Sequence, residues 1–146
     1  MVARVALAFS TLACCVLTGC DWSQTRERHL SDADVRAFKL LDEAVHLPAT
    51  ATNVWVREKS GTDQLQLVRF DAPESDARAF GKALIGAELS PANVPDIRLF
   101  GRDLSRWIRA IPPNAEGGED RRASDRIRKI VLVRQDKDVR IWFVLS

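Results

Sequence analysis

Apolar residues follow several different spacings along this chain of 146 residues, and each spacing predicts a different element. Residues 5–17 are almost wholly apolar. This run is too short to span about 30 Å of hydrocarbon as a helix, and it suits the apolar part of an export signal. Over residues 31–47 the apolar positions recur at helical spacing. Ser31 and Pro48 supply the expected start and end of this amphipathic helix.

Four segments rich in β-branched and aromatic residues predict two hairpins. Residues 53–59 and 64–70 would form the first hairpin, and residues 126–134 and 139–145 the second. Residues 141–145 form the most apolar stretch after the export signal. Such a run is typical of a central strand that is covered on both faces.

Two further helices are expected between the hairpins. Asp71 would cap a helix whose apolar stripe includes Phe80 and Leu84. Residues 103–111 carry apolar side chains at the spacing of a short amphipathic helix, whereas residues 114–124 are expected to form a mobile loop. This order predicts an α+β fold with a small antiparallel sheet built from two hairpins. Two to three helices would pack on one face, with Phe80 and Leu84 over the last strand.

Residues 17–20 read Leu-Thr-Gly-Cys and stand directly after the apolar run. Together with Arg4, the positive charge before that run, they resemble the lipobox of bacterial lipoproteins. The resemblance implies that a diacylglycerol is attached to the sulfur of Cys20 and that the chain is cut before this cysteine. The alternative is an ordinary signal, cleaved or uncleaved, in which Cys20 is incidental.

The lipobox divides the chain into three parts. Residues 1–19 would be the signal peptide, residues 20–30 a polar lipidated tether and residues 31–146 a single domain. Asp21 follows the cysteine directly. In the enteric-type lipoproteins that this arrangement resembles, aspartate at this position retains the protein in the cytoplasmic membrane, on its periplasmic face. The outer membrane is the alternative location.

The domain also resembles, more loosely, a group of small exported lipoproteins of unknown function. Residues 47–54 run from Leu-Pro to Asn-Val at the start of a strand, and residues 69–74 read Arg-Phe-Asp-Ala-Pro-Glu at the start of a helix. Trp107 would be the tryptophan that precedes the closing hairpin in that group. These motifs describe turns and caps, so the resemblance supports the fold and adds no mechanism.

Cysteine and charge narrow the possible functions. The cysteines lie at positions 14, 15 and 20, so the domain after the anchor has no thiol for a disulfide, a metal site or catalysis. Residues 20–96 contain 9 basic and 13 acidic side chains, whereas residues 97–146 contain 12 and 7. The basic half could face anionic lipid, or the charges could form an ordinary solvated surface. No aromatic-rich basic motif favours nucleic acid as a partner.

Candidate catalytic chemistry is scarce, and the sequence predicts no catalytic, cofactor-binding or metal site. His29 falls in the tether, and His46 is placed at the end of the first predicted helix, where a cation favours the helix dipole. The carboxylates Asp136 and Asp138 lack the glycine of a calcium loop and fit a hairpin turn better. No sequence signature of a hydrolase, kinase or dinucleotide-binding enzyme is present.

Trp55 and Arg57 form the candidate contact surface. Val54 and Val56 alternate with them on a short strand, so if the valines face the core, Trp55 and Arg57 face outward. Tryptophan and arginine are enriched where binding energy concentrates. The alternative is that a helix or the tether covers Trp55 and makes it part of the core.

These observations predict a membrane-anchored lipoprotein of the bacterial envelope, attached through lipid on Cys20 and without enzymatic activity. Its domain would contact another envelope protein or stay bound near the membrane. An envelope hydrolase and a carrier of a small ligand are the alternatives, and a carrier would need a deep apolar cavity.

Overall fold

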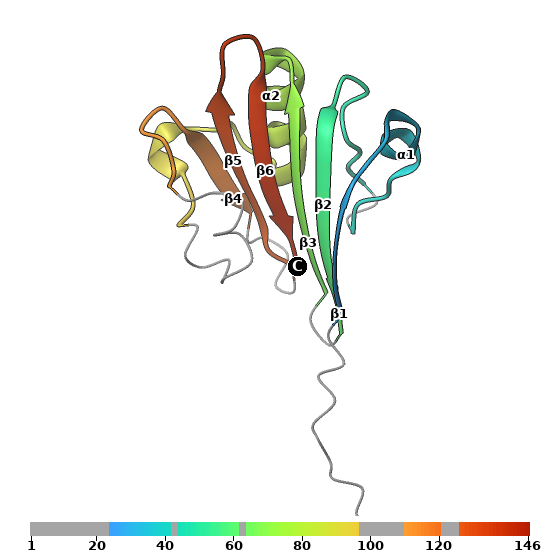
Figure 1. The fold of residues 1–146 in the computed structure, drawn as a ribbon. Coiled ribbons are helices and arrows are strands. Elements are labelled where there is room, and N and C mark those ends of the chain that lie inside the picture. The colour runs from blue at the N-terminus through green and yellow to red at the C-terminus, as the bar shows by residue number, and fades with distance from the viewer. Residues whose placement is uncertain (1–23, 42–43, 62–63, 97–109, 121–125) are drawn as a thin grey trace, which may run out of the picture.

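The computed structural model of this chain describes residues 24–41, 44–61, 64–96, 110–120 and 126–146. Its strands form one six-stranded antiparallel sheet with the order β1-β2-β3-β6-β5-β4 (Figure 1). In chain order the elements are β1 (Gln24–His29), α1 (Asp32–Ala37), β2 (Thr52–Ser60), β3 (Leu65–Ala72), α2 (Glu74–Ile85), the 3₁₀ turn η1 (Pro91–Asn93), β4 (Glu116–Asp120), β5 (Arg128–Arg134) and β6 (Val139–Leu145). The last strand of the chain therefore lies in the middle of the sheet, between β3 and β5.

The prediction of an α+β fold is wrong, because the domain is mainly β. The two α-helices of the described residues, α1 and α2, span only 6 and 12 residues. Both predicted hairpins are present, as β2–β3 and β5–β6, but the sheet has a further strand at each edge. The helix expected at residues 103–111 falls outside the described residues except for its last two positions, which are not helical. Within the described ranges no helix is long and apolar enough to cross a bilayer.

The edge strands β1 and β4 come from segments expected to be a tether and a mobile loop, and these expectations are wrong for residues 24–29 and 116–120. Each edge strand pairs with one neighbour. Backbone pairing forms them without apolar alternation in their sequences, and polar, charged edges also discourage pairing with other chains. In β4, a Cβ atom at Gly117 would lie 2.7 Å from the carbonyl oxygen of Ile130, and one at Gly118 would collide with Ile85. The glycine pair therefore permits close packing.

The first predicted helix forms but is short. Its N-cap is Ser31, whose Oγ accepts a hydrogen bond from a first-turn backbone N–H at 3.3 Å. The helix ends at Ala37, because the buried Gln66 of β3 binds the following segment in an extended form. The Gln66 Oε1 accepts from the backbone N–H of Leu41 at 3.0 Å, and its Nε2 donates to the carbonyl of Lys39 at 3.5 Å. Tertiary hydrogen bonds have replaced helical ones here.

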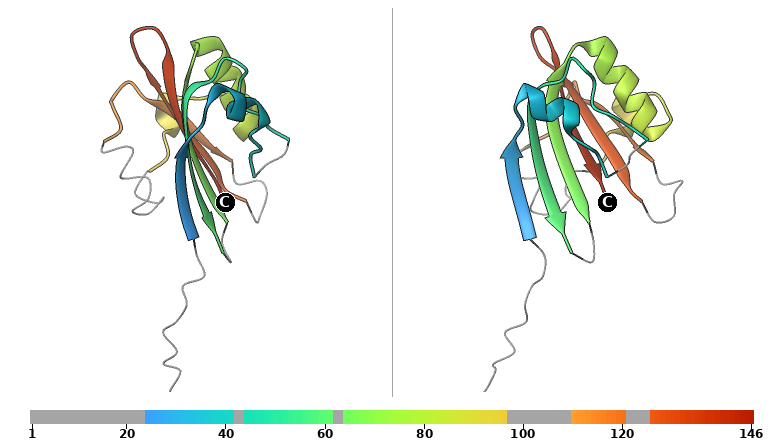
Figure 2. Two further views of the ribbon diagram at one scale, coloured as in Figure 1. Left: turned by 45° about the vertical axis from the view of Figure 1, so that its right-hand side comes forward. Right: turned by 90° about the vertical axis from the view of Figure 1, so that its right-hand side faces the viewer.

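Helix α2 lies across one side of the sheet (Figure 2). The prediction that Asp71 caps it is wrong, because Asp71 belongs to β3 and the cap position is Pro73. The predicted packing is confirmed. The ring centroids of Phe80 and Phe143 lie 5.0 Å apart, and Leu84 is fully buried in the same core.

Side chains of the strands alternate between two faces with different cover. We call the side under α2 the helix face and the other side the open face. The helix face carries the larger core, which includes Val54, Val56, Val68, Phe70, Ile130, Leu132, Ile141 and Phe143. The open face carries a smaller buried cluster of Leu67, Ala115, Val131, Val133, Trp142 and Val144. Polar and aromatic side chains occupy much of the rest of the open face.

Candidate functional site

A line of four side chains crosses the open face from the β1 edge to the middle of the sheet. The strand register pairs His29 with Trp55, Trp55 with Arg69, and Arg69 with Trp142. Directly opposed residues of antiparallel strands lie on the same face, so these four side chains are neighbours. We call them the Trp–Arg row. The outward orientation predicted for Trp55 is confirmed, because Val54 and Val56 are fully buried on the helix face and Trp55 is half-buried on the open face.

Several contacts hold Trp55 in place. The guanidinium carbon of Arg69 lies 5.4 Å from the Trp55 ring centroid, and the ring of His29 lies 5.1 Å away with an interplanar angle of 55°. The indole N–H of Trp55 donates to Asn53 at 3.2 Å. Asn53 has φ 51°, in the left-handed region that asparagine tolerates better than most residues. Trp55 is thus a preorganised side chain with part of its surface still in solvent.

Arg57 lies on the open face beside this row, as predicted. Its cross-strand neighbours are Glu27 on β1 and Leu67 on β3. From Leu67 the strand register leads through Val144 of β6 to Lys129 of β5. The buried Lys129 pairs with Glu119 of β4 at 3.6 Å. Arg57 is half-buried, so its guanidinium belongs to the open surface only in part.

An ion pair between Asp71 and Arg140 borders the row. The Arg140 Nε and one terminal nitrogen bind the two carboxylate oxygens at 2.7 and 2.9 Å. Burial alone would raise the pKa of Asp71, but hydrogen bonds from Arg140 and Asn53 hold it below its usual range. The pKa of Arg69 is lowered, first by burial and then by the positive charge of Arg140. The negative charges of Asp71 and Glu27 offset part of this effect, so the two arginines share this part of the face with two carboxylates.

Two donors of the row have no acceptor. The Nε of Arg69 and the Nε1 of Trp142 are both buried, and neither has a hydrogen-bond partner among the residues that the structure describes. Trp142 as a whole is 8% exposed. A buried donor without an acceptor costs about 1–3 kcal/mol, and most buried polar groups avoid this cost.

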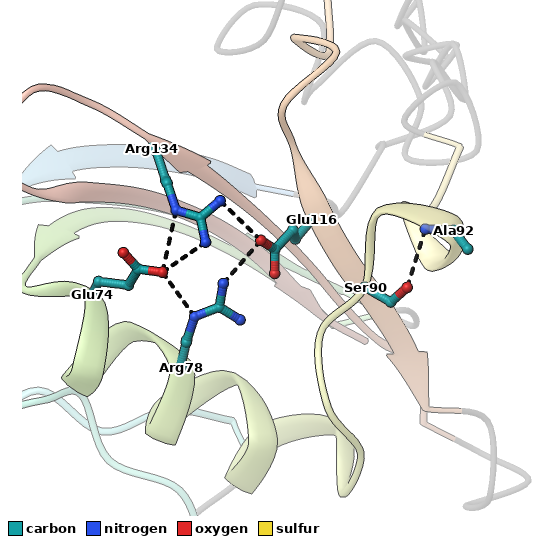
Figure 3. Close-up of polar contacts among 6 residues, drawn as sticks. All are labelled: Glu74, Arg78, Ser90, Ala92, Glu116 and Arg134. Atoms are coloured by element: carbon teal, nitrogen blue, oxygen red, sulfur yellow. Dashed lines mark hydrogen bonds and ion pairs between the residues drawn. The ribbon is translucent and has the colours of Figure 1, made fainter.

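A second polar cluster lies on the helix face, where α2 meets β4 and β5 (Figure 3). We call Glu74, Arg78, Glu116 and Arg134 the four-charge network. Arg78 binds Glu74 and Glu116, each at 2.9 Å. Arg134 binds the same two carboxylates at 2.8 and 3.1 Å. Hydrogen bonds from Arg134 and then Arg78 lower the pKa of Glu74 to about 2. Each charge has its counterpart within the domain, so this network ties three elements together and leaves little for a ligand.

Nearby, the Oγ of Ser90 accepts the backbone N–H of Ala92 at 3.2 Å and caps η1 (Figure 3). The Ser90 backbone also bridges to Gly117 of β4. The turn thus covers part of the outer edge of β4 and serves the fold.

The remaining candidates from the sequence are dispersed. His46 is exposed and lies beyond the end of α1, so its expected place at a helix terminus is wrong. Asp136 and Asp138 lie in the β5–β6 turn, which the Gln135 N–H closes at 2.9 Å to the Asp138 carbonyl. Cys20 and Asp21 lie outside the described residues, as does Trp107. The described ranges contain no group of three metal-ligating side chains.

Sequence reasoning missed His29, Arg69 and Trp142 as members of the row. A signal was present, because Arg69 alternates with two buried neighbours in the same way as Trp55. The row offers stacking surface, positive charge and N–H donors, which is the chemistry of recognition. No protein-family model, curated protein or solved structure matches this chain.

Proposed function

We propose that this chain is a non-enzymatic bacterial envelope lipoprotein, held to the membrane by lipid on Cys20, that binds another envelope protein through its open face. The observation that carries the proposal is the half-exposed Trp55, which Arg69 and His29 hold in place on the open face. A preorganised and partly exposed tryptophan with arginines beside it favours a partner that buries the indole ring.

The shape and composition of the face favour a protein partner. Trp55, Trp142 and several arginines lie on one side of a sheet, and tryptophan and arginine are the side chains that most often dominate protein interfaces. A carrier would instead need a deep apolar cavity. The larger of the two cavities described, about 360 Å³, is lined mainly by polar residues such as Arg26, Glu58 and Lys59. Nucleic acid is not the expected partner, because the predicted location is outside the cytoplasm.

The anchor part of the proposal has its own test. Cys20→Ser should release the protein from the membrane fraction or leave the precursor uncut, because a diacyl anchor gives stable attachment whereas weaker surface contacts are reversible. Membrane fractionation and the mass of the N-terminus measure both effects. We propose retention in the cytoplasmic membrane through Asp21, with Asp21→Ser shifting the protein toward the outer membrane. Normal processing and unchanged membrane attachment of Cys20→Ser would contradict the anchor.

The binding part is tested by recovering partners from membranes with the lipid intact. We expect the wild type to recover a stoichiometric envelope protein, and the Trp55→Ala, Arg57→Ala double variant to lose it. Truncation at a central interface residue costs about 2 kcal/mol or more, which is roughly a thirtyfold loss of affinity. The matched control is Asp136→Ala, Lys137→Ala, which changes two exposed side chains in the distant β5–β6 turn.

Thermal melts decide how the result is interpreted. If the double variant melts like the wild type and loses the partner while the turn control keeps it, the open face is the contact surface. Retention of the partner by a folded double variant would contradict this function. If the double variant unfolds, Trp55 is structural, and Arg69→Gln then replaces it as the test of the same face.

A further inference from the structure

One end of the sheet lies next to the predicted anchor. We call it the anchor end. The first residue of β1, Gln24, pairs with Ser60 at the end of β2, and the β6 terminus at Leu145 pairs with the first residue of β5, Arg128. The C-terminus lies at this end (Figure 1). Three residues separate Cys20 from Gln24. A fully extended chain spans at most about 3.6 Å per residue, so Gln24 lies within about 14 Å of the lipidated cysteine.

Apolar side chains are exposed at this end. Leu41 is 37% exposed and Ile127 is 44% exposed, and these are the large apolar side chains exposed in the described parts of the chain. Both line one cavity of about 90 Å³, together with Leu145 and the C-terminal Ser146. Their position is held by the domain, because the Leu41 N–H binds Gln66 and Ile127 forms two backbone hydrogen bonds of 3.2 Å with Ser146.

Positive side chains flank the apolar pair. Leu41 and Gln64 also line the larger cavity of about 360 Å³, beside Arg26 and Lys59. Arg126 lines the smaller one. Arg26, Lys59 and Arg126 make no ion pair with any residue that the structure describes.

One carboxylate, Glu58, lines the larger cavity, and it is already engaged. Its Oε2 lies 3.6 Å from Arg28, and its Oε1 accepts the amide of Gln66 at 3.1 Å. The cations around the two cavities therefore have no ion pair among the described residues, whereas the carboxylate of Glu58 is bound within the domain.

We propose that the anchor end rests on the membrane, with Leu41 and Ile127 at the boundary of headgroups and acyl chains and with Arg26, Lys59 and Arg126 among anionic lipid headgroups. Interfacial proteins bind membranes through this combination of apolar area and positive charge. The proposal rests on the lipid anchor proposed above. It adds that the anchored domain has a fixed orientation rather than hanging freely from its tether.

The orientation has a consequence for the open face. Ser60 is at the anchor end, and Trp55 lies five positions back along β2. At about 3.3 Å per residue this places the Trp–Arg row roughly 17 Å from that end. A partner would meet the row outside the headgroup layer.

The test uses the full lipidated chain in vesicles and a single introduced thiol. The mature chain has no cysteine besides Cys20. Gln64→Cys places a spin label at the anchor end, and Lys137→Cys places the control label in the exposed turn at the other end of β5 and β6. In vesicles with anionic phosphatidylglycerol, the label at position 64 should collide mainly with lipid-soluble oxygen. The label at position 137 should collide mainly with a water-soluble nickel chelate.

Two comparisons sharpen the result. The first comparison is the triple variant Arg26→Gln, Lys59→Gln, Arg126→Gln in the same vesicles. The second is the chain with its three cations intact in neutral phosphatidylcholine vesicles. In each, the label at position 64 should lose most of its collisions with oxygen. If position 64 stays as accessible to the nickel chelate as position 137 while the protein remains on the vesicles, the fixed orientation is contradicted and the anchor is not.

Other outcomes also decide. Loss of the unmodified chain from the vesicles would contradict both the anchor and this inference. Shielding of position 64 from both reagents, in vesicles that contain no other protein, would indicate a second copy of the chain on the anchor end. It would contradict a lipid contact.

Discussion

The two faces of the sheet treat arginine in different ways. On the helix face, Arg78 and Arg134 each bind the same two carboxylates, and the buried Glu116 is 7% exposed yet bound by both. On the open face, Arg69 stacks on Trp55, and its pKa is lowered by burial first and then by repulsion from Arg140. The first arrangement is complete within the chain, whereas the second leaves donors without acceptors.

The difference teaches where to look for function in a chain without a catalytic motif. A charged cluster in which each charge has a counterpart stabilises the contact between its elements, and a ligand would have to break existing bonds to enter it. A cluster with buried donors that lack acceptors carries a cost in the isolated domain. The open face also leaves part of Trp55 in solvent, and so it is the better candidate for a contact surface.

The largest expected loss of stability comes from a substitution in the core of the helix face. Phe143→Ala should lower the free energy of unfolding by about 3–5 kcal/mol, since Phe143 is fully buried between Phe70 and Phe80. A whole domain has only about 5–15 kcal/mol, so this variant should be close to unfolding. Thermal or urea melts measure the change. A melting curve close to that of the wild type would refute the central position of β6.

The correctly predicted strands are those in which the order of apolar and polar residues shows which side of the strand is buried. β2 alternates Val54 and Val56 with Trp55 and Arg57, so the alternation alone assigns its two sides. β6 is almost continuously apolar, as a central strand should be. The alternation in β2 also predicted that Trp55 and Arg57 lie on the open face.

The missed features depend on neighbours that are distant in sequence. The edge strands β1 and β4 carry no apolar alternation, because one strand partner and partial cover suffice for them. Asp71 has the local signature of a helix cap, yet a bidentate bond with Arg140, from the last strand, assigns it to the sheet. Arg69 and Trp142 become neighbours only through the β3–β6 register. Sequence alternation gives the side of each residue but not its partner.

A smaller effect concerns acid and the four-charge network. The pKa of Glu74 is about 2 in the folded domain, below its ordinary value of 4.5. The ionised form is therefore favoured by folding, so its contribution to stability is present above about pH 4.5 and is lost as the pH falls toward 2. Glu74→Gln should flatten the loss of stability across this range, as measured by melts at a series of pH values.

The control for this prediction is Glu88→Gln, which removes a carboxylate outside the network. It should leave the pH dependence due to Glu74 in place. Because Glu74 is exposed to solvent, the effect should remain smaller than that of Phe143→Ala. An unchanged slope in Glu74→Gln between pH 4.5 and 2 would show that the network does not hold Glu74 ionised.

The smallest expected effect on stability comes from Trp142→Phe, which probes the unsatisfied donor directly. Phenylalanine keeps an aromatic ring in the open-face cluster and removes the buried Nε1–H that has no acceptor. The lost volume costs about 1 kcal/mol, and removal of the unsatisfied donor returns about 1–3 kcal/mol, so the net change should lie between zero and a gain of about 2 kcal/mol for the folded domain. Val131→Ala, in the same cluster, loses volume without that return and should destabilise the domain more.

The same Trp142→Phe variant should bind the partner more weakly. If the partner supplies the acceptor, Trp142→Phe should lose the roughly 0.5–1.5 kcal/mol of a hydrogen bond, about a two- to tenfold loss of affinity, in a domain that melts like the wild type. A variant that keeps both its stability and its full affinity would show that the indole N–H of Trp142 has no role in binding, and the contact surface would then shrink to Trp55 and the arginines beside it.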